Sequence, residues 1–240
     1  MLLDLFRSGF SRDAIISLLL FIPTLLISLT VHEYCHGYAA YKCGDNTAEW
    51  NGRLTLNPLK HLDPIGTIMM LVFGFGYAKP VPVNPRNFKH YKLGLCLVSI
   101  AGPLSNALLS LLGTVLLYIT AQINSDMMRN FFMGISTSFE TVWIVFITTF
   151  IITNASLAVF NLLPIPPLDG SRIITAVLPA KLAYYYNKYE SYIMLAVFAL
   201  LYLNVLDGAI YFLRDGLLSC IEWLTELIPF SDLTKQYINF

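Results

Sequence analysis

Long apolar runs constrain this chain more than any other feature of its sequence. They occupy about residues 14–41, 93–121, 141–163 and 191–206. A helix of about 20 apolar residues crosses the roughly 30 Å hydrocarbon core of a bilayer. Charged residues form only 12% of the chain, against about 25% in average soluble domains, which is too few to cover a surface that faces water. The sequence therefore predicts an all-α polytopic membrane protein.

The remaining segments fit one integral-membrane domain over residues 1–240, because no polar stretch is long enough to form a separate soluble domain. We expect a core over about 14–180 and membrane-associated helices over about 184–230. Segment 65–75 is apolar but too short to span, and segment 74–85 is rich in Gly and Pro. Together they predict a short loop or hairpin that dips into the membrane.

The apolar tail, residues 210–228, leaves two interpretations open. It is either a last span or a helix that lies at the membrane interface. The choice is open because charges interrupt the segment, at Arg214, Asp215, Glu222 and Glu226.

A metal-binding motif lies inside the first apolar run. Residues 32–36 read HEYCH, an HExxH pattern. Side chains four residues apart share one face of a helix, so His32 and His36 can bind one ion, and Glu33 can reach the reacting water without being a ligand. Ionisable groups inside a membrane helix are costly and mark function. Cys35 fills a variable position of the motif, and we expect it to pack and not to bind metal.

A catalytic zinc site needs a third protein ligand and keeps its fourth position for water. Asp169 is the best candidate, because it follows prolines that prevent a helix and let the side chain turn inward. His61 and His90 lie in polar loops, where we expect surface histidines, and Asp207 is predicted on the opposite side of the membrane. The predicted ligands of one Zn2+ per chain are His32, His36 and Asp169.

The distribution of basic residues predicts the orientation of the chain. Short loops rich in Lys and Arg stay in the cytoplasm. Seven such residues lie between the first two spans and three follow the third span, but only Arg129 lies between the second and third spans. This pattern brings the ends of the two spans near His36 and Asp169 to the cytoplasmic side, where one site can contain both residues.

These residue types indicate a hydrolase. Zinc activates water as a nucleophile near neutral pH and polarises a carbonyl group. Glu33 would take the proton from the water and later deliver it to the leaving amine. The sequence therefore predicts a zinc-dependent metalloendopeptidase with Glu33 as its catalytic base.

Several motifs resemble the site-2 protease family of intramembrane zinc metalloproteases. Besides HEYCH, residues 161–170 read NLLPIPPLDG, which resembles the family pattern Asn-x-x-Pro-x-Pro-x-x-Asp-Gly, whose Asp is the third zinc ligand. AGPLSN at 101–106 resembles a Gly-Pro-x-x-Asn signature of the helix between the two ligand helices. Segments 52–67 and 76–88 resemble the small bacterial members, which lack PDZ and nucleotide-sensing domains.

The resemblance covers about residues 15–180 and implies a three-helix catalytic core with flanking transmembrane helices. It implies cleavage in or near the transmembrane helix of single-span membrane proteins, in regulated intramembrane proteolysis, and a location in the bacterial plasma membrane. Segment 74–85 would correspond to a membrane-dipping loop that an extended substrate joins by β-addition. The expected partners are a membrane-protein substrate and membrane lipid, and the zero net charge argues against nucleic acid.

The family likeness also implies that Asn106 and Asn161 bind or orient substrate. For each residue a structural role is equally open. Asn106 would make a hydrogen bond between helices, and Asn161 would cap backbone groups that the prolines set free.

Two other functions are alternatives to a protease. A divalent-metal transporter would use the same three ligands, but such proteins tend to show internal repeats and ionisable residues along a path, which this sequence lacks, and Glu33 would have no role. A catalytically silent metal-binding scaffold would have lost catalytic residues, whereas all those expected are present.

Overall fold

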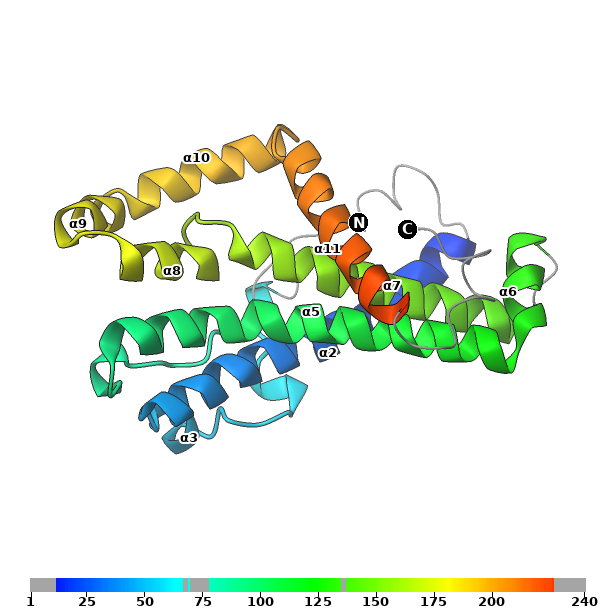
Figure 1. The fold of residues 1–240 in the computed structure, drawn as a ribbon, viewed down its shortest axis with the longest axis horizontal. Coiled ribbons are helices and arrows are strands. Elements are labelled where there is room, and N and C mark those ends of the chain that lie inside the picture. The colour runs from blue at the N-terminus through cyan, green and yellow to red at the C-terminus, as the bar shows by residue number, and fades with distance from the viewer. Residues whose placement is uncertain (1–11, 67–68, 70–77, 135–136, 227–240) are drawn as a thin grey trace.

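The computed structural model describes residues 12–66, 69, 78–134 and 137–226, and these form helices joined by loops (Figure 1). The long helices are α2 (Arg12–Cys43), α5 (Tyr91–Ile123), α7 (Ser138–Leu162) and α11 (Asp207–Glu226). The short ones are α3 (Thr47–Trp50), α6 (Ser125–Phe132), α8 (Asp169–Val177), α9 (Ala180–Lys188) and α10 (Glu190–Tyr202), with single 3-10 turns η1 (Pro58–Lys60) and η2 (Pro85–Asn87).

Three of these helices are long and apolar enough to cross a membrane. Within α2, α5 and α7 the apolar stretches have 29, 33 and 24 residues. Even the shortest reaches about 36 Å at 1.5 Å per residue, which exceeds the bilayer core. The predicted all-α membrane architecture is confirmed, and the first three apolar runs coincide with these helices.

The two sides of α5 show how this helix fits between lipid and protein. Its inward side carries small and polar residues that are buried, among them Ser99, Gly102 and Ser110. This distribution is typical of a membrane helix that packs closely against its neighbours and places polar groups inside the bundle. Its outward side is an exposed stripe of Leu and Ile spaced three or four residues apart: Leu93, Leu97, Ile100, Leu104, Leu108, Leu112, Leu116 and Ile119.

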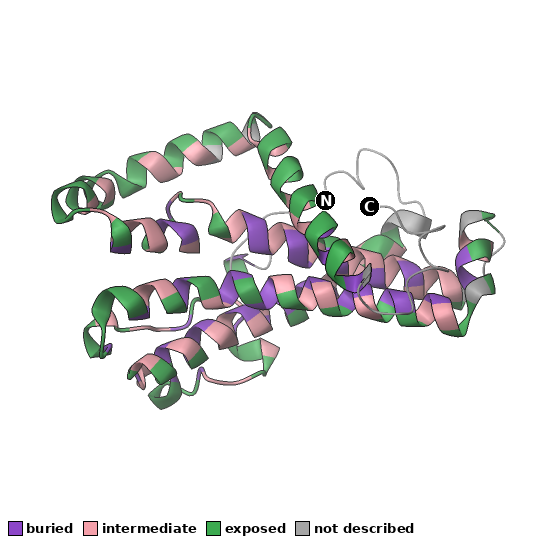
Figure 2. Ribbon diagram, in the orientation of Figure 1, coloured by how far each residue is buried: buried purple, intermediate pink, exposed green. Residues whose placement is uncertain are grey.

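Helix α5 is the centre of the packing. It contacts α2, α7 and α8, while α11 crosses α7 and α5. Buried residues follow the faces on which these helices meet, whereas α9 and α10 are largely exposed (Figure 2). The Ser110 hydroxyl donates a hydrogen bond to the Ile151 carbonyl of α7 at 3.0 Å, so a polar group inside the bundle finds its partner on the neighbouring helix.

Local signals fix both ends of α7. At its start Thr137 and Glu140 form a reciprocal capping box, in which each side chain accepts a hydrogen bond from the other residue's backbone. At its end the helix stops at Leu162, two residues before the first proline of the predicted break. Helix α8 follows and starts at Asp169.

The fourth apolar run departs from the prediction of a full span over 191–206. Helix α10 has 13 residues, which reach only about 20 Å, and it ends before Asn204, whose φ of 56° lies in the left-handed region. The chain then turns into α11. The predicted tail segment 210–228 falls on α11 up to Glu226, and its last two residues lie outside the described part of the chain.

The loop between α2 and α5 is tied to the end of α2 by Asp45. Its buried carboxylate accepts hydrogen bonds from the Asn84 backbone at 2.7 Å and from the Asn87 side chain at 2.7 Å. Burial by itself raises the pKa of Asp45, but these bonds and those from Thr47 outweigh it and lower the pKa. An ionised side chain therefore holds residues 84–87 in place. The preceding residues 78–83, which we call the strap, lie beside α2 as a result.

The structure covers the predicted membrane-dipping segments only in part. Of segment 65–75 it describes residues 65, 66 and 69, and of segment 74–85 it describes residues 78–85. The other positions of both predictions lie outside the described residues.

Candidate metal centre

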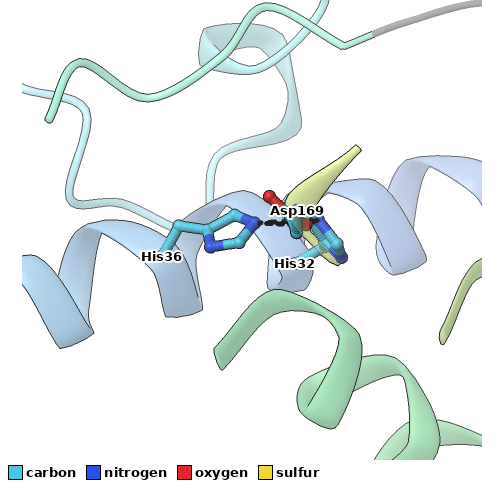
Figure 3. A group of neighbouring side chains, drawn as sticks. All are labelled: His32, His36 and Asp169. Carbon is cyan, nitrogen blue, oxygen red and sulfur yellow. Dashed lines mark hydrogen bonds and ion pairs between the residues drawn. The ribbon is translucent and has the colours of Figure 1, made fainter. Parts of the chain in front are cut away.

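Two imidazoles on one face of α2 begin the site. His32 and His36 are buried and one helical turn apart, and their Nε2 atoms lie 3.0 Å from each other. Figure 3 shows both rings on the same helix, directed toward the segment that carries Asp169. The four-residue spacing thus presents two ring nitrogens to one point.

Asp169 reaches the same point from the first turn of α8. Its Oδ2 atom lies 3.2 Å from His32 Nε2 and 3.1 Å from His36 Nε2. The next residue, Gly170, allows this approach: a Cβ there would lie 2.3 Å from the Leu162 carbonyl oxygen. Only glycine lets the start of α8 pack this closely against the end of α7.

The three ligand atoms form a nearly equilateral triangle with sides of 3.0, 3.1 and 3.2 Å. In a tetrahedral zinc site with bonds of about 2.0–2.1 Å, the ligand atoms are roughly 3.3 Å apart. Two imidazoles and one carboxylate are also a donor set found in catalytic zinc sites. The observed group therefore fits a zinc ion with small adjustments of the side chains.

Electrostatics favour a cation at this group. Burial by itself raises the pKa of the Asp169 carboxyl, but the imidazoles of His32 and His36 beside it outweigh this effect and hold that pKa well below its usual range. The carboxylate is therefore ionised at neutral pH, and this is the form that binds metal.

The other nitrogen of each ring is held by α5. His32 Nδ1 lies 2.5 Å from the Asn106 side-chain oxygen, and His36 Nδ1 lies 2.6 Å from the Val98 carbonyl oxygen. A carbonyl oxygen only accepts hydrogen bonds, so each Nδ1 donates, and Nε2 keeps its lone pair for a metal. Helix α5 therefore sets both the orientation and the tautomer of the two rings.

A glycine lets α5 come this close. A Cβ at Gly102 would lie 2.4 Å from His36 Nε2 and 2.7 Å from His32 Cε1. The sequence did not predict that Gly102 lies against the two histidines. Its place in AGPLSN, on a helix expected to neighbour the ligand helix, was the available signal, because small residues in membrane helices mark close approach.

Asn106 makes the hydrogen bonds between helices that the sequence left open as one of two roles. Its side chain has no exposed surface. Besides His32, it contacts the Ser28 carbonyl at 3.3 Å and the Asn154 side chain at 2.9 Å. These contacts with α2 and α7 fit the structural role of a hydrogen bond between helices.

Replacing Asn106 with alanine is expected to weaken zinc binding by about 10–100-fold, the usual effect of losing the partner that orients a ligand. Competition with a zinc chelator on purified protein measures this change. Asn161→Ala is the matched control and should keep the wild-type affinity, because Asn161 contacts no ligand. Equal affinities in the two variants would show that His32 is oriented without Asn106.

Asn161 lies at a different place, on the wall of a cavity. Its side-chain nitrogen donates to the Leu157 carbonyl of its own helix at 3.0 Å. Within the described residues its side-chain oxygen has no hydrogen-bond partner. The predicted contact with substrate is therefore sterically available to Asn161.

Glu33 also faces this cavity. Its carboxylate accepts a hydrogen bond from the Val81 backbone N–H at 2.8 Å, and it does not belong to the cluster of ligand atoms. The cavity has a volume of about 750 Å3 and lies between α2, α5, α7, α8, α10 and the strap. Its wall is mostly apolar, and its polar or charged residues are His32, Glu33, His36, Ser99, Asn161, Asp169 and Arg172.

The other residues considered as ligands lie apart from the cluster. His90 is exposed before α5, Asp207 begins α11, and Cys35 is half-buried on α2. His61 departs from the expected surface histidine: it is 1% exposed, and its Nε2 binds the Thr55 carbonyl at 2.8 Å. Polar neighbours in the sequence predicted exposure for His61, but its ring is buried, and its carbonyl accepts a hydrogen bond from the Lys79 N–H of the strap at 2.9 Å.

Comparisons with known proteins found a family and several relatives that the chain resembles. The sequence model of peptidase family M50 matches residues 20–204. "Putative zinc metalloprotease YwhC" of Bacillus subtilis is 48% identical over 169 residues, which are 70% of this chain and 74% of that protein.

Proteins named Rip2, which carry the same description, are more distant relatives. The one from Mycolicibacterium smegmatis is 31% identical over 63% of this chain and 54% of its own length. The one from Mycobacterium tuberculosis is 30% identical over 60% of this chain and 52% of its own length. The chain thus spans about half the length of the Rip2 proteins. No solved structure matches the chain significantly.

Proposed function

The chain belongs to peptidase family M50, the site-2 protease family of metalloproteases, and from this premise we propose that it is an intramembrane zinc endopeptidase. One observation carries the proposal: His32, His36 and Asp169 converge from two helices, and the carboxylate of Glu33 faces the same cavity. That cavity lies among helices that are able to span a membrane.

The residues divide the chemistry among them. His32, His36 and Asp169 would hold one zinc ion, which when bound activates water and polarises the scissile carbonyl. Glu33 accepts the proton of the attacking water on a carboxylate oxygen and delivers it to the nitrogen of the leaving amine. The side-chain oxygen of Asn161 accepts a hydrogen bond from a substrate N–H, and Asn106 orients His32.

The apolar wall of the cavity supports a membrane-embedded substrate. Leu29, Val98, Leu157 and Phe160 line it beside the ligands, and such side chains suit the residues of a transmembrane segment. We propose that the substrate is a single-span membrane protein, cleaved in or near its transmembrane helix as part of regulated intramembrane proteolysis. Membrane lipid is the second partner, and nucleic acid is not one.

The basic loops support an active site that faces the cytoplasm. Helices α3, α8 and α9 lie at one end of the bundle, together with the start of α5, while α6 lies at the other end (Figure 1). The first end holds the segments with most Lys and Arg, and short loops of this kind stay inside. We place the protein in the bacterial plasma membrane with this end in the cytoplasm.

The proposal is tested without knowing the substrate. Membranes from cells that produce the wild type or Glu33→Gln are treated with a label for free protein N-termini and analysed by mass spectrometry. New termini within or near transmembrane segments should appear with the wild type only. Identical sets of termini from both membranes would refute proteolysis by this site.

A further inference from the structure

The position of Glu33 depends on the strap, residues 78–83. Within the described residues, the Glu33 carboxylate accepts one hydrogen bond, from the Val81 N–H at 2.8 Å. Ala78, Pro80, Val81 and Val83 of the strap also line the cavity. The strap therefore sets the direction of the carboxylate and forms part of the surface that a substrate meets.

The strap does not stabilise its own backbone through hydrogen bonds between residues 79 and 82. Pro80 and Pro82 have no N–H, and the N–H of Val81 is used by Glu33. The N–H of Lys79 donates to the His61 carbonyl at 2.9 Å. Residues 79–82 therefore have no free backbone donor in this structure, and the strap depends on other parts of the chain to hold it.

A buried arginine, Arg53, binds the backbone carbonyls of the strap. The Nη2 atom of Arg53 donates to the Lys79 carbonyl at 2.7 Å and to the Pro80 carbonyl at 3.3 Å. Arg53 is only 8% exposed, and within the described residues it has no ion pair with an acidic side chain. Its Nε is also buried and without a partner. Burying a guanidinium with so little compensation is costly, which argues that these contacts serve a purpose.

We propose that Arg53 is the positioning residue of the catalytic base. It holds the carbonyls of residues 79 and 80, and the next N–H along the strap, that of Val81, holds Glu33. Removing the guanidinium leaves two carbonyls without their donor and lets the strap move, and Glu33 loses its fixed direction. This inference rests on the proposed function in one respect, namely that Glu33 acts as a base.

The first test follows the strap itself by hydrogen–deuterium exchange in full-length protein purified in detergent. A peptide over residues 79–83 reports only the amides of Val81 and Val83, since Lys79 becomes its N-terminal amine and the other two residues are prolines. Arg53→Gln should raise exchange in this peptide at least about tenfold. Arg86→Gln is the matched control, because Arg86 is exposed on the same loop, and it should leave exchange unchanged. Unchanged exchange in Arg53→Gln would overturn the proposal.

The second test measures cleavage of a doubly tagged single-span protein whose cleavage requires Glu33. Arg53→Gln should lower kcat by about 10–100-fold, as expected when a catalytic group is misplaced, with KM within about threefold and zinc content unchanged. Arg53→Lys keeps the charge and one donor and should recover part of kcat. It also serves as the test variant if Arg53→Gln does not fold.

A double variant separates positioning from simple destabilisation. Val81→Pro removes the N–H that binds Glu33 and should lower kcat as Arg53→Gln does. The double variant Arg53→Gln, Val81→Pro should lower kcat little further than either single variant does, because both substitutions act through the hydrogen bond between Val81 and Glu33. If the two reductions of kcat multiply in the double variant, or if Arg53→Gln keeps the wild-type kcat, the proposed role of Arg53 is wrong. Absence of any cleavage by the wild type would instead refute the proposed function, and the exchange experiment would still decide whether Arg53 holds the strap.

Discussion

Substituting Gly102 with alanine is expected to empty the metal centre while the helical fold persists. The new methyl group would lie 2.4 Å from His36 Nε2 and 2.7 Å from His32 Cε1, so both rings must turn away from Asp169. Neither ring can move without losing its bond to α5, at Val98 or Asn106. We expect zinc affinity to fall by more than the roughly 100-fold that marks the upper range for a lost supporting contact. Zinc analysis and circular dichroism of the same sample measure both parts of this result.

Gly216→Ala is the matched control for this substitution. A Cβ at Gly216, inside α11, would meet no atom within 4 Å. This variant should keep its zinc, and it gains about 0.5–1 kcal/mol because alanine favours a helix more than glycine does. A Gly102→Ala protein that retains zinc at wild-type affinity would show that α5 does not approach the ligands this closely.

Replacing Glu33 with glutamine is expected to stop cleavage and to leave zinc bound. Glutamine has nearly the same shape and still offers an oxygen to the Val81 N–H, so the strap keeps its partner. It cannot accept the proton of the attacking water at neutral pH. General-base catalysis contributes about 10²–10⁴ to a rate, and cleavage of the substrate found by N-terminal labelling should fall by that factor.

Glu49→Gln provides the control for the loss of a negative charge. Glu49 is exposed on α3, and its replacement should leave both cleavage and zinc content unchanged. The assignment of Glu33 would be wrong if Glu33→Gln cleaved within about twofold of the wild-type rate. It would also be wrong if this variant lost its zinc, because Glu33 would then be a ligand and not the base.

The sequence was sufficient to predict the parts of the site that depend on local spacing. His32 and His36 are four residues apart inside a helix, and this geometry alone directs both rings to one point. Asp169 required more, because 133 residues separate it from His36. The prolines predicted a break in the chain, and the family motif identified the carboxylate that follows it.

The supporting contacts could not be predicted, because backbone groups carry no signature in a sequence. The Val98 carbonyl that holds His36 and the Val81 N–H that holds Glu33 belong to residues that look like ordinary apolar positions. Asn106 was noticed, but its enclosure by α2 and α7 depends on packing between helices distant in the chain. The choice between a contact with substrate and a contact with His32 therefore required the structure.

The limits of the fold prediction have a similar cause. The apolar runs predicted the ends of the three spanning helices to within a few residues, since the length and hydropathy of a segment determine whether it can span a membrane. The same content suggested a fourth span, but Asn204 adopts a left-handed conformation and separates α10 from α11. Asn tolerates that conformation better than most residues, and only the observed backbone reveals that it is used here.

The ratio of zinc to protein shows whether His32, His36 and Asp169 hold a metal ion. It is determined on detergent-purified wild type beside Asp169→Ala and Asp207→Ala, each of which removes the aspartate of an Asp-Gly pair. We predict about one zinc per chain in the wild type and in Asp207→Ala, and a large loss in Asp169→Ala. A wild type without zinc, or an Asp169→Ala protein that keeps all of it, would contradict the proposed centre.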